Sequence, residues 1–366
     1  MKIAVPLEIK TQEFRVGLLP SAAYQLTRQG HQVLVQRGAG EGTGYPDAQY
    51  EEAGAILLDD ASTLFAEAEL VVKVKEPQPE EYDLLRPGQI LFTYLHLAAN
   101  RELTEALCRS GVTALAYETI AVNDRLPLLE PMSEIAGRMS ILAGGYFLAK
   151  HVNGSGVLLG GVPGVLPGRV MVLGGGVAGI NAARMATGLG ADVTVLEVDV
   201  ERMRFLDITL HTAHTLYSSE AHILEQLPRV DVLVGAVLVP GDKAPRLINR
   251  EMLRCMRPGS VLVDIAIDQG GCSETSRPTT HHDPVYIEQG VTHYCVANMP
   301  AAYARTATQA LTNVTQRYVE TLAQQGLADA CKSAPELIGG INTFQGHLTC
   351  EAVAHAHGIP CHPLSL

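Results

Sequence analysis

The sequence lacks any long hydrophobic run. Its longest apolar stretches, residues 230–239 and 261–267, are far shorter than the roughly 18 residues that a membrane-spanning helix needs. The first ten residues, MKIAVPLEIK, carry a charge at Glu8 and show no small-residue cleavage pattern, which is unlike a signal peptide. We therefore expect a soluble protein with no membrane partner.

An excess of basic residues is also lacking. The chain has 27 Lys and Arg against 39 Asp and Glu, which gives a formal net charge of −12. Proteins that bind nucleic acid or anionic membranes carry a basic footprint. Nucleic acid is therefore not an expected partner.

The cysteines include no C-x-x-C pair. They are dispersed along the chain as Cys108, Cys255, Cys272, Cys295, Cys331, Cys350 and Cys361. An odd, scattered set in a large chain is typical of reduced thiols in the cytosol rather than of a disulfide framework. We expect a cytoplasmic location.

The histidines offer no pattern with the spacing of a zinc site. The candidate groups are His211 with His214, His281 with His282, and the tail set His355, His357, Cys361 and His362. None has a matching second half, and we expect the tail to be a loop. No metal is expected.

The hydrophobic pattern indicates an α/β fold. A chain of 366 residues is long enough for two or three domains. Strands are expected at residues 2–6, 31–36, 70–74, 89–95 and 113–117, with helices at 22–30 and 101–109. This alternation favours a parallel sheet with helices on both faces. A second alternating unit has expected strands at 170–173, 192–196, 231–237, 261–266 and 293–297.

Two long helices are expected to flank the second unit. One opens near Met132, with Ser133 as its N-cap, and the other covers residues 307–325 and ends at Gly326. We predict two Rossmann-like domains with parallel sheets, joined by these helices, with the active site in the interdomain cleft. The first domain takes residues 1–127 plus 305–366, and the second takes residues 128–304.

A glycine-rich loop marks the second domain as the one that binds a dinucleotide. Residues 169–183, RVMVLGGGVAGINAA, place Gly174, Gly176 and Gly179 between an expected strand and an expected helix. The first glycine permits the tight turn, the second lets the backbone approach a pyrophosphate, and the third lets helix pack on strand. Val177 and Ala178 open the helix, whose free N–H groups face the phosphates. The alternative is a structural glycine turn that binds nothing.

An acidic residue ends the next expected strand, eighteen residues beyond Gly179. Glu197 would accept hydrogen bonds from the ribose hydroxyls and repel a 2′-phosphate, which favours NAD over NADP. Arg202 and Arg204 lie close enough in sequence to weaken that preference, because an arginine can accommodate the extra phosphate.

Charged and polar residues follow several expected strands. Lys75, His96, Asp268 and Asn298 come directly after strands, and Arg15 follows a polar loop after the first strand. Ligands gather at the carboxyl ends of strands in open α/β sheets. An arginine can bind a carboxylate through two hydrogen bonds, a lysine can polarise a carbonyl, and a histidine can transfer protons near neutral pH. The set suits an anionic substrate.

Each of these residues also has an ordinary structural interpretation. An isolated lysine after a strand is usually solvated, and an isolated histidine usually has a structural hydrogen bond. Arg15 could form a surface ion pair, and Asp268 could cap the following turn. Their shared placement at strand ends favours a site without identifying a reaction.

The chain resembles the alanine dehydrogenase family over essentially its full length, and more loosely the nucleotide-binding subunit of nicotinamide nucleotide transhydrogenase. The matching motifs include the E-x-R-V around Arg15, LVVKVKEP at 70–77, ILFTYLHLA at 90–98, PMSEIAGRM at 131–139 and GGVPGV at 160–165. They continue with the glycine loop, VGAVLVPGDKAP at 234–245, VDIAIDQGGCSETSRPTT at 263–280 and CVANMPA at 295–301. So many long motifs in matching order make the resemblance specific.

The resemblance implies oxidative deamination of L-alanine to pyruvate and ammonium with NAD, and the reverse reaction, in a homohexamer. His96 and Asp268 match catalytic residues, while Arg15, Lys75, Met132 and Asn298 match residues at the substrate. The matching cofactor contacts, besides the glycine loop, are Ser133, Glu197, Arg202, Ser218, Arg277 and Asn298. Gly175 stands where alanine is more usual, and we expect it to add flexibility to the loop.

Other functions stay open. A transhydrogenase-like subunit would bind NAD(H) and pass hydride to NADP(H) on a partner, but it would not need Lys75 and His96. A non-catalytic NAD-binding protein would be favoured by the loss of Arg15, Lys75, His96 or Asp268, and none is lost. A dehydrogenase of another small L-amino acid differs by about one heavy atom in its substrate, which a small pocket discriminates only roughly 10- to 200-fold.

Overall fold

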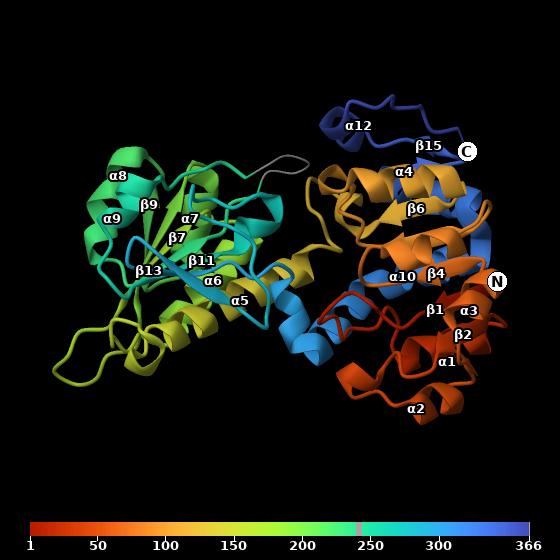
Figure 1. The fold of residues 1–366 in the computed structure, drawn as a ribbon, viewed down its shortest axis with the longest axis horizontal. Helices are drawn as coiled ribbons and strands as arrows, with labels where there is room; N and C mark the ends of the chain where they lie inside the picture. Colours follow the sequence, from red (N-terminus) through yellow and green to blue (C-terminus); the bar gives the residue numbers. More distant parts are fainter. Residues whose placement is uncertain (239–243, 366) are drawn as a thin grey trace. The chain divides into compact units, whose positions relative to one another are not determined.

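The computed structural model describes residues 1–238 and 244–365. Residues 239–243, which belong to the motif at 234–245, lie outside the described part. The chain forms two compact units (Figure 1). Unit 1 comprises residues 1–131 and 303–366, and unit 2 comprises residues 132–302.

The described part of unit 1 is built on an eight-stranded sheet in the order β15-β14-β6-β5-β4-β1-β2-β3. The strands are β1 (Lys2–Val5), β2 (Gln32–Gln36), β3 (Ile56–Leu58), β4 (Leu70–Val72), β5 (Ile90–Thr93), β6 (Thr113–Ala116), β14 (Ile341–Phe344) and β15 (His347–Leu348). The strands from β3 through β6 pair in parallel, whereas β14 pairs antiparallel with β6 and β15. Every residue of β4, β5 and β6 is buried, as expected for parallel strands that are covered on both faces.

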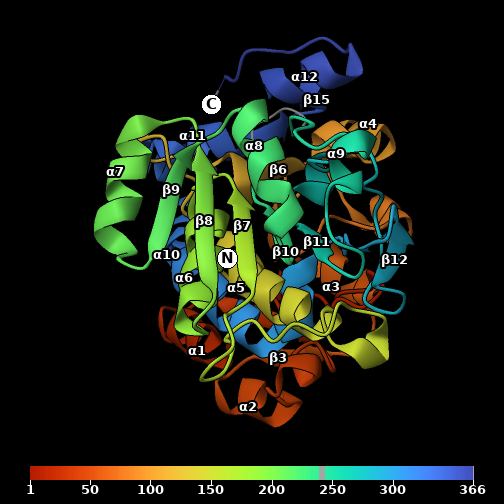
Figure 2. The same cartoon turned by 90° about the vertical axis from the view of Figure 1, so that its left-hand side faces the viewer.

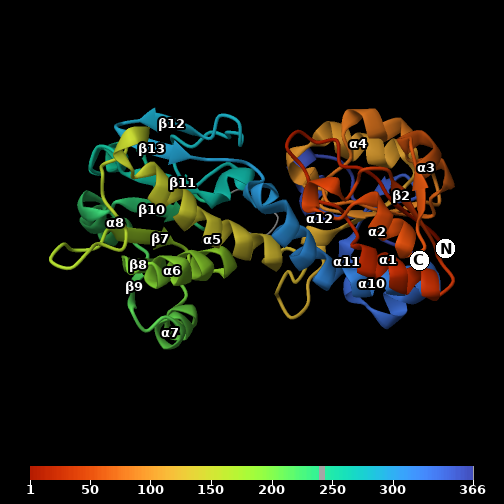
Figure 3. The same ribbon diagram turned by 90° about the horizontal axis from the view of Figure 1, so that it is seen from below.

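The helices of unit 1 begin and end with recognisable signals. They are α1 (Pro20–Arg28), α2 (Asp47–Glu52), α3 (Ala61–Glu67), α4 (Arg101–Ser110), α10 (Ala304–Ser333), α11 (Glu336–Gly340) and α12 (Glu351–His357). Pro20 opens α1, and the side chain of Asn100 caps α4, which ends at the left-handed Gly111. Helix α10 packs beside α1 (Figure 3). It breaks at Gly326, where φ is 72°, the residue predicted to end it.

Unit 2 contains a seven-stranded sheet in the order β12-β13-β11-β10-β7-β8-β9, counted over its described residues. The strands are β7 (Arg169–Leu173), β8 (Asp192–Glu197), β9 (Ala213–Tyr217), β10 (Val232–Gly235), β11 (Val261–Asp264), β12 (Val285–Glu288) and β13 (Val291–Tyr294). Figure 2 shows β7, β8 and β9 side by side. All neighbours are parallel except the edge strand β12.

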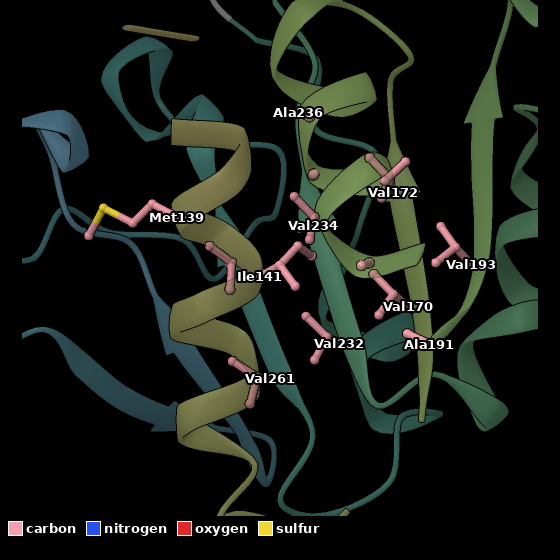
Figure 4. Close-up of a cluster of buried hydrophobic side chains, with 14 of the residues drawn as sticks. Met139, Ile141, Val170, Val172, Ala191, Val193, Val232, Val234, Ala236 and Val261 are labelled. Carbon is pink, nitrogen blue, oxygen red and sulfur yellow. The ribbon is translucent and has the colours of Figure 1, made fainter. Parts of the chain in front are cut away.

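Alternate residues of the central strands of unit 2 pack on opposite faces of the sheet. Val170 and Val172 of β7 belong to a core with α5 (Glu130–Phe147), α6 (Val177–Gly188) and α7 (Val200–Thr209). Figure 4 shows Ile141 of α5 facing Val232 and Val234, with Val170 and Val172 of β7 beyond them. Met171 and Leu173 pack on the other face against α8 (Glu220–Gln226) and α9 (Arg250–Arg254). Because successive side chains of a strand point to opposite faces of the sheet, this alternation determines which layer of helices each residue contacts.

The structure corrects several details of the predicted elements. Helix α5 begins at Glu130, so Ser133 lies inside it and is not the N-cap. Pro131 is tolerated there because the first turn of a helix needs no N–H donors. The tail is not a loop throughout, since residues 351–357 form α12. Both sheets are mixed rather than wholly parallel.

Strands β3, β9, β12, β14 and β15 were not predicted, and β3 and β9 show one reason. These two strands carry partly exposed residues without a clean alternation of buried and exposed positions, which weakens the sequence signal.

Candidate active site

Two of the predicted site residues of unit 1 follow neighbouring parallel strands. Strand β4 ends at Val72, and Lys75 comes three residues later. Strand β5 ends at Thr93, and His96 comes three residues later. The prediction that these strands run directly to the functional residues is therefore wrong in detail. Both residues lie in the loops at the same edge of the sheet, where ligands bind in such folds.

Arg15 is fully buried and is held by a carboxylate that was not predicted from the sequence. Its Nε lies 2.7 Å from Oε1 of Glu13, and its Nη2 lies 2.6 Å from Oε2. The main-chain N–H of Arg15 also donates to Glu13 (3.0 Å). Burial by itself would lower the pKa of Arg15, but the hydrogen bonds and charge of Glu13 hold it above the ordinary value. Arg15 is thus a fixed cation whose Nε–Nη2 side is occupied by Glu13.

Lys75 is buried beside a second carboxylate. Its Nζ lies 3.7 Å from Oε2 of Glu76, and Lys10 pairs with the other oxygen of Glu76. Burial alone would raise the pKa of Glu76, but the charges of Lys75 and Lys10 outweigh it and hold the pKa below its usual value. The charge of His96 acts in the same direction. Glu76 therefore stays an anion near both Lys75 and His96.

His96 occupies a left-handed backbone conformation, with φ 50° and ψ 39°. Glu118 stabilises this turn by accepting hydrogen bonds from the main-chain N–H groups of Leu95 (3.0 Å) and His96 (2.6 Å). The imidazole Nδ1 lies 4.0 Å from the same carboxylate, and the ring stacks on Tyr94 with centroids 5.9 Å apart. The side chain is 38% exposed, so it can exchange protons with a ligand.

Tyr94 stacks against the His96 ring. It is buried, and its hydroxyl donates to the carbonyl of Leu128. Burial raises the pKa of Tyr94 well above its ordinary value, with the charge of Arg15 acting against that rise. The phenol is therefore a neutral hydrogen-bond donor.

The glycine loop of unit 2 has the geometry predicted from its sequence. Gly174 has φ 93° and follows β7 directly, and Gly176 is the N-cap of α6. A Cβ on Gly179 would lie 1.8 Å from the carbonyl oxygen of Gly174, so helix and loop touch. A Cβ on Gly176 would meet nothing within 4 Å, which leaves room for a pyrophosphate to approach the backbone. Val177 and Ala178 form the first turn of α6. The residues present fit a dinucleotide.

Gly175 is held at both of its polar groups. Its N–H donates to Oε2 of Glu197 (2.7 Å), and its carbonyl accepts from Nε of Arg202 (2.6 Å). A Cβ there would lie 2.6 Å from Leu206. The expectation that Gly175 adds flexibility is therefore wrong. Arg204, the other arginine close to Glu197 in sequence, forms an exposed ion pair with Glu201.

Asp268 lies in a 3-10 turn four residues beyond the end of β11, not at the strand end that the sequence suggested. The strand ends at Asp264, a fully buried carboxylate that was not predicted. It accepts hydrogen bonds from the N–H groups of Ala266 (3.1 Å) and Cys272 (2.8 Å) and from Ser276. Asp264 thereby fixes the loop that carries the exposed Asp268.

The remaining predicted residues all lie in unit 2. Met132 is buried and Ser133 half-buried on α5, and Ser218 directly follows β9. The guanidinium of Arg277 lies 4.0 Å from the ring centroid of Tyr286. Asn298 is left-handed, with φ 63°, and lies four residues beyond β13 rather than directly after it, as the sequence suggested.

Among the described residues, no group of three or more His, Cys, Asp or Glu side chains is arranged to hold a metal ion. In the same part of the chain, no helix has both the length and the apolar character to cross a membrane.

Family models match the two parts of the chain. Residues 4–136 match the model "Alanine dehydrogenase/PNT, N-terminal domain", and residues 140–351 match "Alanine dehydrogenase/PNT, C-terminal domain". The chain belongs to the alanine dehydrogenase/PNT family. The predicted family membership is confirmed.

Relatives of this family match almost the whole chain. An alanine dehydrogenase of Halomonas elongata is 56% identical over 361 residues, which cover 98% of this chain and 97% of the relative. An alanine dehydrogenase of Mycobacterium tuberculosis is 51% identical over 362 residues and 98% of both chains. One from Geobacillus stearothermophilus is 52% identical over 98% of this chain and 97% of its own.

Solved structures give the same result. An L-alanine dehydrogenase superposes with a TM-score of 0.94 at 51% identity, covering 98% of this chain and 99% of its own. A transhydrogenase from Sinorhizobium meliloti superposes with a TM-score of 0.81 at 25% identity, covering 96% and 100%. The predicted α/β class with two largely parallel sheets is confirmed. Family membership and the glycine loop together imply that the chain binds NAD(H).

Proposed function

We propose that this chain catalyses the NAD-dependent oxidative deamination of L-alanine to pyruvate and ammonium, and the reverse reductive amination. The observation that carries this is identity above 50% to alanine dehydrogenases over nearly the full length of both chains. The transhydrogenase alternative is less supported, because that likeness is at 25% identity.

Arg15 and Lys75 are the proposed ligands of the substrate carboxylate. Arg15 is a permanent cation fixed by Glu13, so a carboxylate meets a preorganised charge. Lys75 is additionally proposed to polarise the carbonyl oxygen of pyruvate. Met132 and Asn298 are the proposed lining of the substrate pocket.

NAD, when bound, accepts the hydride that leaves the substrate Cα. Its proposed binding residues are Gly174, Gly176, Val177, Ala178, Gly179, Ser133, Glu197, Arg202, Ser218, Arg277 and Asn298. Open space at Gly176 and the free N–H groups of the first turn of α6 support this assignment. The carboxylate of Glu197 supports a preference for NAD over NADP.

His96 is the proposed proton carrier. Loss of hydride from the neutral-amine form of alanine gives an iminium, to which water adds, and the resulting carbinolamine expels ammonia. His96 takes the proton from the attacking water and returns one to the leaving nitrogen. Asp268 is the proposed second catalytic group, with the role of holding that water or amine. The predicted placement of the active site in the interdomain cleft stays a prediction.

We also propose a cytoplasmic homohexamer. All seven cysteines lie in the described residues and are free thiols, which supports a reducing compartment. Leu158, Val162, Val165 and Leu166 are exposed together on one loop of unit 2, which supports subunit contacts. Light scattering should give about six times the chain mass of 39.1 kDa, and a monomer mass would refute the assembly.

The test of the reaction uses purified protein with L-alanine and NAD at mildly alkaline pH, followed by the absorbance of NADH. D-alanine and NADP serve as controls. NADH formation with L-alanine and not with D-alanine supports the proposal. Bound NAD without any turnover of L-alanine would contradict it.

A further inference from the structure

The segment that carries Lys75 extends beyond the hydrogen bonds that join β4 to β1. Strand β1 pairs with β4 only at Ile3↔Leu70 and Ala4↔Val71. On the opposite side, β5 still holds the segment, because the N–H of Lys73 donates to Phe92 (3.1 Å). The main-chain N–H groups of this segment that face β1 therefore need another hydrogen-bond acceptor.

Glu8 supplies that partner. Its Oε1 accepts hydrogen bonds from the main-chain N–H groups of Val74 (2.6 Å) and Lys75 (3.2 Å). The carboxylate takes the place that a carbonyl of β1 would occupy if the strand continued. Glu8 is 7% exposed, so these bonds are shielded from water.

A buried lysine completes the arrangement around Glu8. Nζ of Lys73 lies 3.2 Å from Oε2 of Glu8 and 2.7 Å from Oε1 of Glu81. Burial raises the pKa of Glu8, and the charge of Lys73 opposes this rise. Lys73 thus orients the Glu8 carboxyl so that Oε1 points at the two N–H groups.

The same loop carries the other proposed ligand of the substrate carboxylate. Residues 6–15 contain Glu8, Lys10, Glu13 and Arg15, and the N–H of Glu13 donates to the carbonyl of Lys10 (3.0 Å). Lys10 pairs with Glu76, next to Lys75. The loop of Arg15 is therefore tied to the segment of Lys75 at two points, Glu8 and Lys10.

We propose that Glu8 is a positioning residue, which sets the main chain of Lys75 relative to Arg15 so that both cations meet one substrate carboxylate. The effect acts through hydrogen-bond acceptance at Oε1, and not through the charge of Glu8. This rests on the roles proposed above for Arg15 and Lys75.

Three variants at position 8 distinguish an effect of hydrogen-bond acceptance at Oε1 from an effect of the Glu8 charge. Glu8→Gln keeps an acceptor oxygen at the same reach and removes the charge. Glu8→Asp keeps the charge and shortens the side chain by one methylene, so it cannot reach both N–H groups. Glu8→Ala removes both, and Glu52→Ala, at an exposed position of α2, is the matched control.

The measurements are KM for L-alanine, KM for pyruvate, kcat, and the Kd of NADH. We expect Glu8→Ala and Glu8→Asp to raise both KM values about 10- to 50-fold, with the Kd of NADH within twofold of wild type. Glu8→Gln should stay within about fivefold of wild type, and Glu52→Ala should match it. If Glu8→Ala does not fold, the difference in KM between Glu8→Gln and Glu8→Asp tests the inference by itself.

A normal KM in Glu8→Asp, or a Gln variant as impaired as Asp, would overturn the inference. So would a rise in the Kd of NADH equal to the rise in KM, because that marks a general structural defect. A wild-type protein with no activity toward L-alanine would instead refute the proposed function, which keeps the two failures distinguishable.

Discussion

Substitutions at two glycines of the nucleotide loop distinguish an effect on folding from an effect on cofactor binding. A Cβ on Gly179 would lie 1.8 Å from the carbonyl oxygen of Gly174, and real β-carbons essentially never come within 3.0 Å of such an atom. Both contacting groups are main chain, so α6 or the loop must move by about 1.2 Å. Overpacking of this kind costs about 1–3 kcal/mol, and rigid main-chain partners place Gly179→Ala near the upper end.

Gly176→Ala is the matched variant in the same turn. Its φ of −65° suits alanine, and the added Cβ would meet nothing within 4 Å. It would, however, fill the space that a pyrophosphate uses. We expect it to keep its melting temperature within about 1 °C and to raise the Kd of NADH at least about tenfold, which is about 1.4 kcal/mol.

The assay is thermal denaturation without ligand, followed by NADH titration of each folded variant. For Gly179→Ala, about 3 kcal/mol corresponds to a fall of about 6–12 °C in melting temperature. A Gly176→Ala variant that binds NADH as tightly as wild type would refute the placement of the cofactor. A Gly179→Ala variant as stable as wild type would refute the packing argument.

Three further predictions concern named side chains. His96→Ala should retain NADH binding and lose about 10²- to 10⁴-fold in turnover, the usual range for a lost general acid or base; steady-state kinetics within a few-fold of wild type would remove His96 from the mechanism. Glu197→Ala should bind NAD more weakly and discriminate less against NADP, because the acceptor for the ribose and the tie to Gly175 are both lost; an unchanged preference between the two cofactors would contradict this. Burial lowers the pKa of His293 below 6.5, partly opposed by its bond to Val291, so the unfolded chain binds the proton first and stability falls as pH drops below about 6.5, by at most about 1.4 kcal/mol per pH unit. His293→Gln should flatten the melting temperature between pH 7 and 5, and an equally steep profile in that variant would assign the effect to other groups.

The nucleotide loop was predictable because its determinants are local. Gly174, Gly176 and Gly179 act through main-chain geometry within six residues, and the structure has the predicted tight turn, open backbone and close packing at these positions. Strand ends were predicted less well. Val74 and Leu95 are fully buried, so hydrophobicity extends past the last ladder residue and makes each strand look longer than it is.

The carboxylates that support the site were not predictable. Glu13 and Glu118 bind residues near them in space, and only Glu13 is also near its partner in sequence. No motif distinguishes a glutamate that accepts main-chain N–H groups from one on the surface, because the difference arises from tertiary burial. The left-handed conformation of His96 is likewise not predictable from the sequence, because histidine is enriched in this region but most histidines do not adopt it.

The left-handed conformation of His96 lowers stability at the position of a residue that is proposed to act in catalysis. A residue other than glycine gives up about 1–2 kcal/mol in the left-handed region, and the chain accepts this loss at the residue proposed to transfer protons. Glycine would remove the strain and the imidazole together. His96→Gly should therefore melt at a higher temperature than His96→Ala while both lose about 10²- to 10⁴-fold in turnover, and equal melting temperatures would show that the left-handed backbone does not destabilise the alanine variant.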